Sequence, residues 1–387
     1  MSQVFTILIH GLAWMSLGLL LMAAAMATLN ALFAGRLRQV SAAVANLPLV
    51  SVLVPVRDEA DNLRKILPAL KASNYGNMEV IVLDDESRDG SGEIASSILR
   101  DAGFPARVVT GQPWSPGLGL SGKAHACAQL AELARGEILL FCDADMMPSP
   151  DAVGLTAAHM TSPRFRDHAA GLSALPGQTC RGWRERMLIP WIMHLPLMVS
   201  VPLFCSWRLP FGTMQMANGQ WVAIDARDYV ASGGHRRLGA TPLEDVALAR
   251  LVHRVTGRGI RPVFAASDMT AAMYGDWRAM LAGFSKNLVA IGGGTPATFL
   301  FVILMVNTVF LFPLWGWLVQ AGLAAAALAA CLMARLVTAA VFQMPARDLL
   351  MHPVSLFLLD LAAWKSIACS WRGAYEWKDR VVKWSAT

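Results

Sequence analysis

The chain has 387 residues, of which 55% are hydrophobic and 16% are charged, and its mean hydropathy is +0.45. This composition is too apolar for an ordinary soluble enzyme and indicates a membrane protein. The net charge of +6 would suit a nucleic-acid partner, but basic flanks of membrane spans explain the same excess, so we expect no nucleic-acid partner. The six cysteines form no Cys-x-x-Cys pair and are expected to be free thiols in a reducing compartment.

The first apolar stretch predicts an N-terminal transmembrane anchor over residues 1–35. No Asp, Glu, Lys or Arg precedes Arg36, and residues 5–33 are long enough to span a bilayer. The stretch is too long for the apolar part of a signal peptide and lacks a positive segment before it, so we expect an uncleaved anchor. Arg36 and Arg38 predict that the chain continues in the cytoplasm. A linker is expected over residues 36–48.

From residue 49 the pattern changes to strands that alternate with helices. Apolar, β-branched runs predict strands over residues 49–56, 79–83, 106–110 and 138–142, separated by helices that end near residues 71, 101 and 134. This alternation predicts an α/β fold with a Rossmann-like, mostly parallel sheet covered by helices on both faces. Strand after strand is followed by acidic residues, and ligands of such sheets bind outside the carboxyl ends of the strands.

The strand over residues 138–142 runs into Asp143-Ala144-Asp145. Alternate residues of a strand share a face, so we expect Asp143 and Asp145 to aim at one point beyond the strand end. Two carboxylates suit Mg²⁺ or Mn²⁺, which bind one or two carboxylates together with substrate phosphates. The alternative is a solvated loop that carries two acids, because Asp-x-Asp is common.

Several segments occur in the order found in family 2 glycosyltransferases: Val54–Glu59, Asp84–Ser87, Gly122-Lys123 and Asp143–Asp145. Three later segments resemble the acceptor side of that family: Asn218–Gln220, Tyr229–His235 and Leu243–Asp245. Over residues 49–291 the chain thus resembles these inverting enzymes, which have a GT-A nucleotide-sugar-binding fold. The family usually has Asn where Asp58 stands, a mild departure.

The resemblance implies how a donor would be held. Asp58, Glu59 and Asp85 would contact the nucleoside of a nucleotide-sugar donor, expected to be a UDP-sugar, and Lys123 would lie near its diphosphate. The carboxylates of the Asp143–Asp145 segment would hold the metal that bridges the diphosphate. The chemistry fits these residue types, because a sugar diphosphate leaves as an anion and needs positive charge beside it.

The resemblance also implies that Asp245 is the general base. An acceptor hydroxyl needs a base within hydrogen-bonding reach, and Glu244 beside it would raise the pKa of Asp245 by like-charge repulsion. The alternative is an acidic pair in the first turn of a helix, stabilised by the helix dipole and capped by Thr241.

An uncharged insert follows the metal motif. Pro190, Pro196 and Pro202 interrupt it and argue against a single straight span, and arginines flank it. We expect a broken helix in the membrane interface, within residues 183–208. The alternative is a soluble apolar hairpin packed on the sheet. An interfacial insert places the site at the bilayer surface and favours a lipid-like acceptor.

The C-terminal third predicts two spans and a further, shorter apolar helix. Residues 298–334 carry no charge and have the right length for two spans, so residues 292–343 form the predicted transmembrane hairpin. Arg335 and Arg347 mark the return to the cytoplasmic side. Residues 349–363 are short and polar for a span, and we expect a re-entrant or interfacial segment within residues 344–387.

The basic, tryptophan-rich tail carries Trp377-Lys378-Asp379-Arg380. This run resembles a Trp-Lys-Gly-Arg signature near the C-terminus of carotenoid- and hopanoid-type family 2 enzymes, with Asp379 in place of Gly. The resemblance implies that Trp377 and Arg380 contact the donor. The alternative is that the tail binds membrane lipids through its tryptophans and basic residues.

Together these features predict a multi-pass protein of the inner cell membrane with a cytoplasmic catalytic domain. Its expected activity is that of an inverting hexosyltransferase, moving a sugar from a nucleotide-diphosphate sugar to a lipid-like hydroxyl or carboxyl acceptor. A processive polysaccharide synthase is the alternative, but a Gln/Arg-x-x-Arg-Trp run is missing after Asp245 and the predicted spans are few. A non-catalytic membrane scaffold with a sugar-nucleotide-type fold is the alternative of another class.

Overall fold

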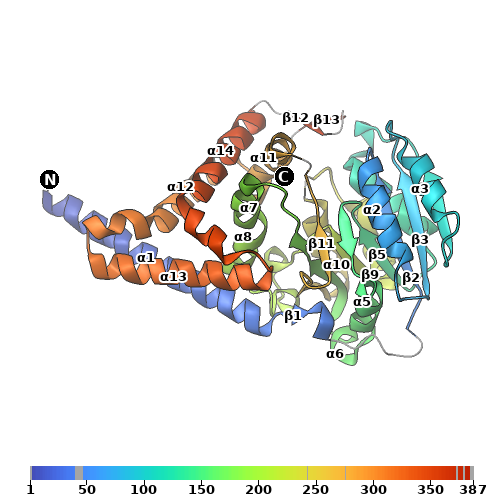
Figure 1. Cartoon of the computed structure of the whole chain (residues 1–387), viewed down its shortest axis with the longest axis horizontal. Coiled ribbons are helices and arrows are strands. Elements are labelled where there is room, and N and C mark those ends of the chain that lie inside the picture. Colours follow the sequence, from blue (N-terminus) through green and yellow to red (C-terminus); the bar gives the residue numbers. More distant parts are fainter. Residues whose placement is uncertain are drawn as a thin grey trace.

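The computed structural model describes residues 2–39, 47–241, 243–274, 276–371, 374–377 and 380–383. These residues form a helical bundle and an α/β unit that lie end to end (Figure 1).

The α/β unit is built on an eight-stranded sheet with the strand order β1-β10-β7-β9-β5-β2-β3-β4. All the strands predicted from the sequence are present, as β2 (Val50–Val56), β3 (Met78–Asp84), β4 (Ala106–Thr110) and β5 (Ile138–Cys142). They pair in parallel. The α/β fold with a mostly parallel sheet is therefore confirmed.

The other half of the sheet contains strands that the sequence analysis did not place. They are β7 (Ala169–Leu175), β9 (Trp221–Asp225) and β10 (Gly259–Phe264). Strand β9 lies antiparallel between β5 and β7. Strand β1 (Gly35–Arg36) pairs with β10 at the sheet edge, although residue 36 was expected to begin a linker. The N-terminal helix thus leads directly into the sheet.

Helices cover both faces of the sheet, and alternate strand residues face opposite ways. On one face Val52 and Val54 pack with α2 (Ala60–Lys71), α3 (Ser91–Leu99) and α5 (Ala152–Thr161). On the other face Leu53 packs with α4 (Gly122–Leu133), α9 (Ala226–Ser232) and α10 (Glu244–Thr256). The two cores fix the strand ends, and with them the loops that carry the acidic residues.

A second, three-stranded sheet consists of β6 (Met146–Pro148), β11 (Met269–Ala271) and β8 (Gly177–Gln178). Strand β11 is antiparallel to β6 and parallel to β8. Just beyond this pairing, the Ala272 N–H donates to the Asp145 carbonyl at 3.0 Å. The small sheet therefore links the Asp143–Asp145 segment to the chain that enters the apolar insert.

The insert is the predicted broken helix. It comprises α7 (Trp183–Ile189), a π-helical turn η3 (Pro190–His194) and α8 (Leu195–Ser200). Much of it is buried between the bundle and the sheet: Trp191 and Met198 belong to the core of the bundle. The side chain of Asn30 donates to the carbonyls of Met198 and Val201 at 2.9 and 2.7 Å, which ties the insert to the N-terminal helix.

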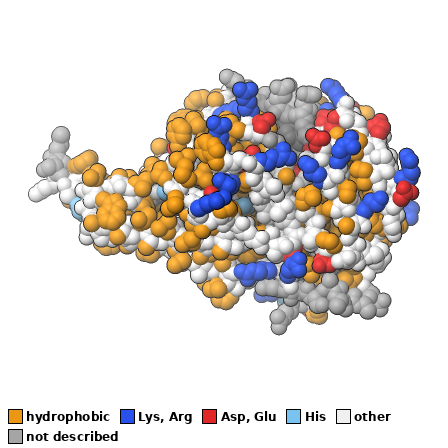
Figure 2. Space-filling view, in the orientation of Figure 1, with side chains coloured by type: hydrophobic (Ala, Val, Ile, Leu, Met, Phe, Trp, Pro, Cys, Tyr) orange, Lys and Arg blue, Asp and Glu red, His pale blue; other side chains and the backbone are white. Residues whose placement is uncertain are grey.

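The bundle contains α1 (Ser2–Phe33), α12 (Pro296–Trp315) and α13 (Ala321–Val341), with α11 (Trp277–Ile291) and α14 (His352–Trp371) between it and the sheet. Within the described residues, four helical segments are long and apolar enough to cross a membrane: Gln3–Phe33, Pro296–Leu318, Ala321–Val341 and Ala346–Trp371. On the face shown in Figure 2, hydrophobic side chains cover much of the bundle and charged ones gather over the α/β unit and its border.

Helix α14 is longer than the apolar stretch over residues 349–363 that the sequence suggested. Near its start the Ser355 hydroxyl contacts Met187 Sδ of α7 at 3.5 Å, and near its end the Ser366 hydroxyl accepts from the Val289 N–H of α11 at 3.2 Å. Helices α7 and α11 both follow strands of the small sheet closely. The first residue of α14, His352, also contacts the Phe310 carbonyl of α12 and Arg335 of α13. The helix is therefore part of the bundle, and its re-entrant or interfacial course stays a prediction.

A short hairpin, β12 (Ala374–Trp377) and β13 (Arg380–Lys383), follows α14. Trp377 and Arg380 are paired across it. Lys378, Asp379 and the side chains of the hairpin lie outside what the structure describes, so the contact of Trp377 and Arg380 with a donor stays a prediction.

We predict the membrane topology from the distribution of basic residues. A reporter inserted at Gly322, at the start of α13, should be external, and a reporter fused after Thr387 should be cytoplasmic, because Arg335, Arg347 and the basic tail favour the cytoplasmic side. Reporter activity in intact cells checks both positions. An external reporter at Thr387 would show that α14 crosses the membrane.

Candidate active site

The candidate site lies where the carboxyl ends of β2, β3 and β5 meet the first turn of α10. Strand β5 is fully buried up to Cys142, and a tight turn follows it. Here the Asp143 N–H donates to the Gln220 carbonyl at 3.1 Å and the Met146 N–H donates to the Asp143 carbonyl at 3.2 Å. The turn brings Asp143 and Asp145 out of the apolar strand at the sheet edge.

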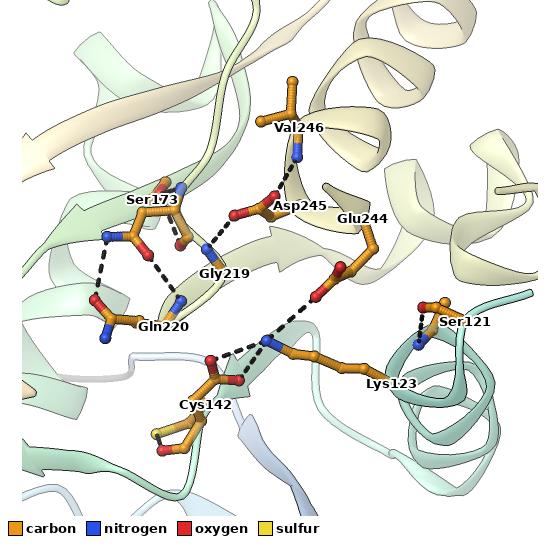
Figure 3. Close-up of polar contacts among 12 residues, drawn as sticks. Ser121, Lys123, Cys142, Ser173, Gly219, Gln220, Glu244, Asp245 and Val246 are labelled. Carbon is orange, nitrogen blue, oxygen red and sulfur yellow. Dashed lines mark hydrogen bonds and ion pairs between the residues drawn. The ribbon is translucent and has the colours of Figure 1, made fainter. Parts of the chain in front are cut away.

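Lys123 connects the two halves of the site. Its Nζ lies 2.7 and 2.9 Å from the carboxylate oxygens of Asp143, and 3.4 Å from Oε1 of Glu244 (Figure 3). The lysine projects from the first turn of α4, where the Ser121 hydroxyl caps the helix by accepting from the Ala124 N–H at 3.1 Å. Burial works against its charge, but Asp143 and Glu244 outweigh burial and raise the pKa of Lys123 well above its ordinary value, so it stays cationic.

Asp145 is held in an environment that suits a cation. Its Oδ1 is buried and has no hydrogen-bond partner among the described residues. Burial, followed by the nearby charge of Asp143, raises the pKa of Asp145 to about 7. A buried carboxylate oxygen without a partner is costly, and a bound cation would stabilise its charged form.

Asp245 lies in the first turn of α10 and is held by two backbone groups. Its Oδ2 accepts from the Gly219 N–H at 2.7 Å, and its Oδ1 accepts from the Val246 N–H at 2.8 Å (Figure 3). Burial, followed by the charge of Glu244, raises the pKa of Asp245 to about 6. Its protonation state therefore changes close to neutral pH.

The acidic pair of Glu244 and Asp245 lies at a helix start, as the structural alternative predicts, and the role of Asp245 as a general base stays a prediction. The prediction that Thr241 caps this helix is wrong: the N-cap is Leu243, without a side-chain cap bond, and the Thr241 hydroxyl accepts from the Leu243 N–H at 3.2 Å in the turn before the helix. The same turn brings Glu244 to Lys123, so the helix start also belongs to the site.

Gly219 lies between Lys123 and Asp245. A Cβ atom at this position would lie 3.3 Å from both Asp245 Oδ2 and Lys123 Nζ. Glycine thus lets the backbone approach both charged groups. Ser173 fixes the preceding residue, because its hydroxyl accepts from the Asn218 N–H at 2.8 Å. No sequence pattern pointed to Ser173, because it is a single hydroxyl in an apolar strand.

The predicted nucleoside-binding residues lie in neighbouring loops after β2 and β3. The Asp58 carboxylate accepts from the Arg88 N–H at 2.7 Å, and the Asp58 N–H donates to the Ser87 hydroxyl at 3.0 Å, so the two loops are tied together. Glu59 accepts from the Asn62 amide at 2.7 Å, and Asp85 is buried. Asp58 has a φ of +50°. Asn and Asp adopt this left-handed conformation more readily than other residues, so the departure from Asn costs the backbone little.

One segment that resembles the acceptor side has a supporting position instead. The Tyr229 hydroxyl and His235 Nδ1 form a buried hydrogen bond of 2.9 Å. Their rings pack against Phe141 of β5, with centroid distances of 5.4 and 4.7 Å. Tyr229 and His235 therefore support the strand that carries the acids.

A metal ion would find few ligands from the protein alone. Among the described residues, no group of three or more His, Cys, Asp or Glu side chains is arranged to hold one. Asp143 already pairs with Lys123 through both oxygens, whereas Asp145 offers an unpartnered one. A metal here would take most of its ligands from a bound molecule, as Mg²⁺ usually does at phosphates.

Comparison with known proteins agrees with this geometry. Residues 51–188 match the profile of Glycosyl transferase family 2. These residues are a family 2 glycosyltransferase domain. The match includes the predicted donor and metal residues in the loops and stops before Glu244 and Asp245, so the position of these two acids rests on the structure.

Two curated relatives resemble parts of the chain. The 4,4'-diaponeurosporenoate glycosyltransferase of Staphylococcus haemolyticus (strain JCSC1435) is 25% identical over 277 residues, covering 66% of this chain and 65% of the relative. The dolichol-phosphate mannosyltransferase of Mycosarcoma maydis is 33% identical over 113 residues, covering 27% of this chain and 36% of the relative. The chain thus spans less than two thirds of the length of either relative.

Among solved structures, the mannosyltransferase PcManGT from Pyrobaculum calidifontis, in complex with GDP-Man and Mn²⁺, has a similar fold. It shares 20% identity and a TM-score of 0.56, over 94% of this chain and 98% of the mannosyltransferase. The chain has the GT-A fold, with helices at both ends long enough to span a membrane.

Proposed function

We propose that the protein is an inverting glycosyltransferase that moves a hexose from a nucleotide-diphosphate sugar to a lipid-like acceptor at the cytoplasmic membrane face. The observation that carries this proposal is the position of Lys123, which joins Asp143 on the donor side to Glu244 on the acceptor side. Nucleotide and sugar chemistry need these charges together, whereas a structural scaffold does not.

The donor would lie along the ends of β2, β3 and β5. Asp58, Glu59 and Asp85 line the loops where the nucleoside would bind, and the expected nucleoside is uridine. Lys123 would neutralise charge that develops on the leaving diphosphate. The residues fit a divalent ion, Mg²⁺ or Mn²⁺, with Asp145 as its main protein ligand and Asp143 beside it. When bound, the ion would act as a Lewis acid on the diphosphate.

The acceptor would approach from the side of Asp245. Attack on the anomeric carbon requires removal of the acceptor's hydroxyl proton as the new bond forms. The backbone bonds from Gly219 and Val246 hold the Asp245 carboxylate in place, and each carboxylate oxygen has a further lone pair for that proton. Single displacement at one face of the sugar inverts the anomeric configuration.

A lipid-like acceptor is supported by the membrane-type helices and by the buried insert beside the site. Four apolar helices and the family 2 domain occur in one chain, and the S. haemolyticus relative is named for transfer to 4,4'-diaponeurosporenoate. Together they favour an acceptor delivered from the bilayer.

The metal assignment predicts the effect of Asp145→Ala. The variant should lose transfer activity, and UDP with Mn²⁺ should no longer raise its melting temperature, because the diphosphate loses its counter-ion site. Asp101→Ala, at an exposed aspartate, is the matched control and should behave as the wild type. Full Mn²⁺-dependent stabilisation of Asp145→Ala by UDP would refute the assignment.

The base assignment predicts that Asp245→Asn lowers turnover by about 10²–10⁴-fold with donor affinity nearly unchanged. The amide keeps the shape of the side chain and removes its basicity. Product formation measures turnover, and calorimetry with UDP measures donor affinity. If donor affinity falls together with the rate, Asp245 is a donor or structural residue.

The pKa of Asp245 also predicts a pH profile. Because the base must be deprotonated, turnover should fall as the pH drops through about 6. Glu244→Gln removes the neighbouring negative charge and should lower the pKa of Asp245, which moves this acid limb to lower pH. A rate profile that is unchanged by Glu244→Gln, or that moves to higher pH, would contradict the assignment.

A further inference from the structure

A cavity of about 280 Å³ lies where the bundle meets the α/β unit. Its walls come from β8 and the residues after it, from the insert α7–η3–α8, and from the end of α13 with the segment that follows. The volume is near the lower end of the range for small-molecule pockets, enough for the head of an amphiphile and the first part of its chain.

Unpartnered polar atoms gather around this cavity. Among the described residues, the buried atoms without a hydrogen bond include Gln178 Oε1, Trp191 Nε1 and His194 Nε2, all on residues that line it. Trp191 and His194 are only 4% and 3% exposed. Buried polar groups normally find partners, so this concentration points to a polar ligand.

The charged groups of the lining favour an anion. Two of the described lining residues are arginines, Arg186 and Arg335, and one is an acid, Asp348. Asp348 lies 3.4 Å from Arg186. Arg335 is buried, donates from Nη1 to the Leu349 carbonyl at 2.9 Å, and faces the Trp191 ring at 5.6 Å. A carboxylate or phosphate would balance the excess positive charge.

The rest of the lining is apolar. Met187, Leu195, Ala339 and Phe342 are buried and form part of the bundle core or its edge. A small hydrophilic anion would leave these surfaces without a partner, whereas an amphiphile would cover them with its chain. The mixed wall therefore fits an acidic head followed by hydrocarbon.

A short hydrogen-bonded path joins the cavity to the candidate active site. The Gln178 amide donates to Gln220 Oε1 at 3.1 Å, and the Gln220 carbonyl accepts from the Asp143 N–H at 3.1 Å. The residue before Gln220 is Gly219, which donates to Asp245. The cavity wall at Gln178 is therefore hydrogen-bonded to a residue whose own carbonyl positions Asp143.

We propose that this cavity binds the acceptor, and that the acceptor is an acidic amphiphile. Its carboxylate or phosphate would lie at Arg186 and Arg335, its chain along the insert, and its reacting hydroxyl toward Gln220 and Asp245. This inference rests on the proposed function and adds to it the charge of the acceptor and the place where it binds.

The test measures binding to the full-length protein in detergent, by displacement of a fluorescent fatty acid. The probes are palmitate, hexadecyl phosphate and hexadecan-1-ol, which share a chain length and differ in the head. We expect at least one acidic probe to bind about tenfold or more tightly than the alcohol, because a charge-assisted hydrogen bond to arginine is lost with the neutral head. The acidic probe that binds more tightly shows whether the site prefers a carboxylate or a phosphate head.

Matched variants locate the site. Ala339→Phe fills the cavity and should abolish displacement by the acidic probes, whereas Ala340→Phe, at the exposed neighbouring residue of α13, should not. Arg186→Gln should remove most of the preference for acidic heads, and Arg184→Gln, at an exposed arginine of the same helix, should keep it. Arg186 is partly exposed, so this second pair stays informative if Ala339→Phe does not fold.

Two results would overturn the proposal: equal binding of hexadecan-1-ol and both acids, or equal behaviour of the variants and their controls. Stabilisation of the wild type by UDP with Mn²⁺ is measured in parallel. If UDP has no effect while the acidic probes behave as expected, the proposed donor function fails and the cavity remains an anionic-lipid site. If UDP binds while the variants leave probe binding unchanged, only the acceptor site is wrong.

Discussion

The ion pairs of Lys123 are the constraint on which the site depends. One ammonium group lies between Asp143, at the end of a buried strand, and Glu244, at the start of a helix. Without that cation, four carboxylates would lie close together in a largely buried space, which is electrostatically unfavourable. The lysine allows Asp143, Asp145, Glu244 and Asp245 to occupy one site, where burial and then the neighbouring acids raise the pKa of Asp145 and of Asp245.

The membrane part is continuous with this site. The insert α7–η3–α8 packs against α1 through Asn30 and leads back to β8, and β8 belongs to the small sheet whose first strand directly follows Asp145. A ligand bound between the bundle and the α/β unit would therefore contact chain segments that also position the acids. This continuity would allow the proposed membrane-derived acceptor and the proposed nucleotide-sugar donor to meet in one protein.

Much of the α/β half was predictable because its apolar, β-branched runs are also the segments that the sheet buries. The strands over residues 106–110 and 138–142 were predicted with the bounds they have, and the acids after β3 and β5 lie at the sheet edge as expected. The strands β7, β9 and β10 were not predicted. Strand β9 lies antiparallel between β5 and β7, and such pairing between distant segments leaves no periodic pattern in the local sequence. The role of Gly219 was equally invisible, since it depends on two side chains brought in from α4 and α10.

The central claim is a single displacement at the sugar, with Asp245 as the base. The most direct test incubates the purified full-length protein with isotopically labelled UDP-sugars, Mn²⁺ and a lipid extract, and determines the anomeric configuration of the extracted product by NMR. The account predicts labelled lipid whose configuration is inverted relative to the donor, and none from Asp245→Asn. A product with the donor's configuration, or undiminished product from Asp245→Asn, would contradict it.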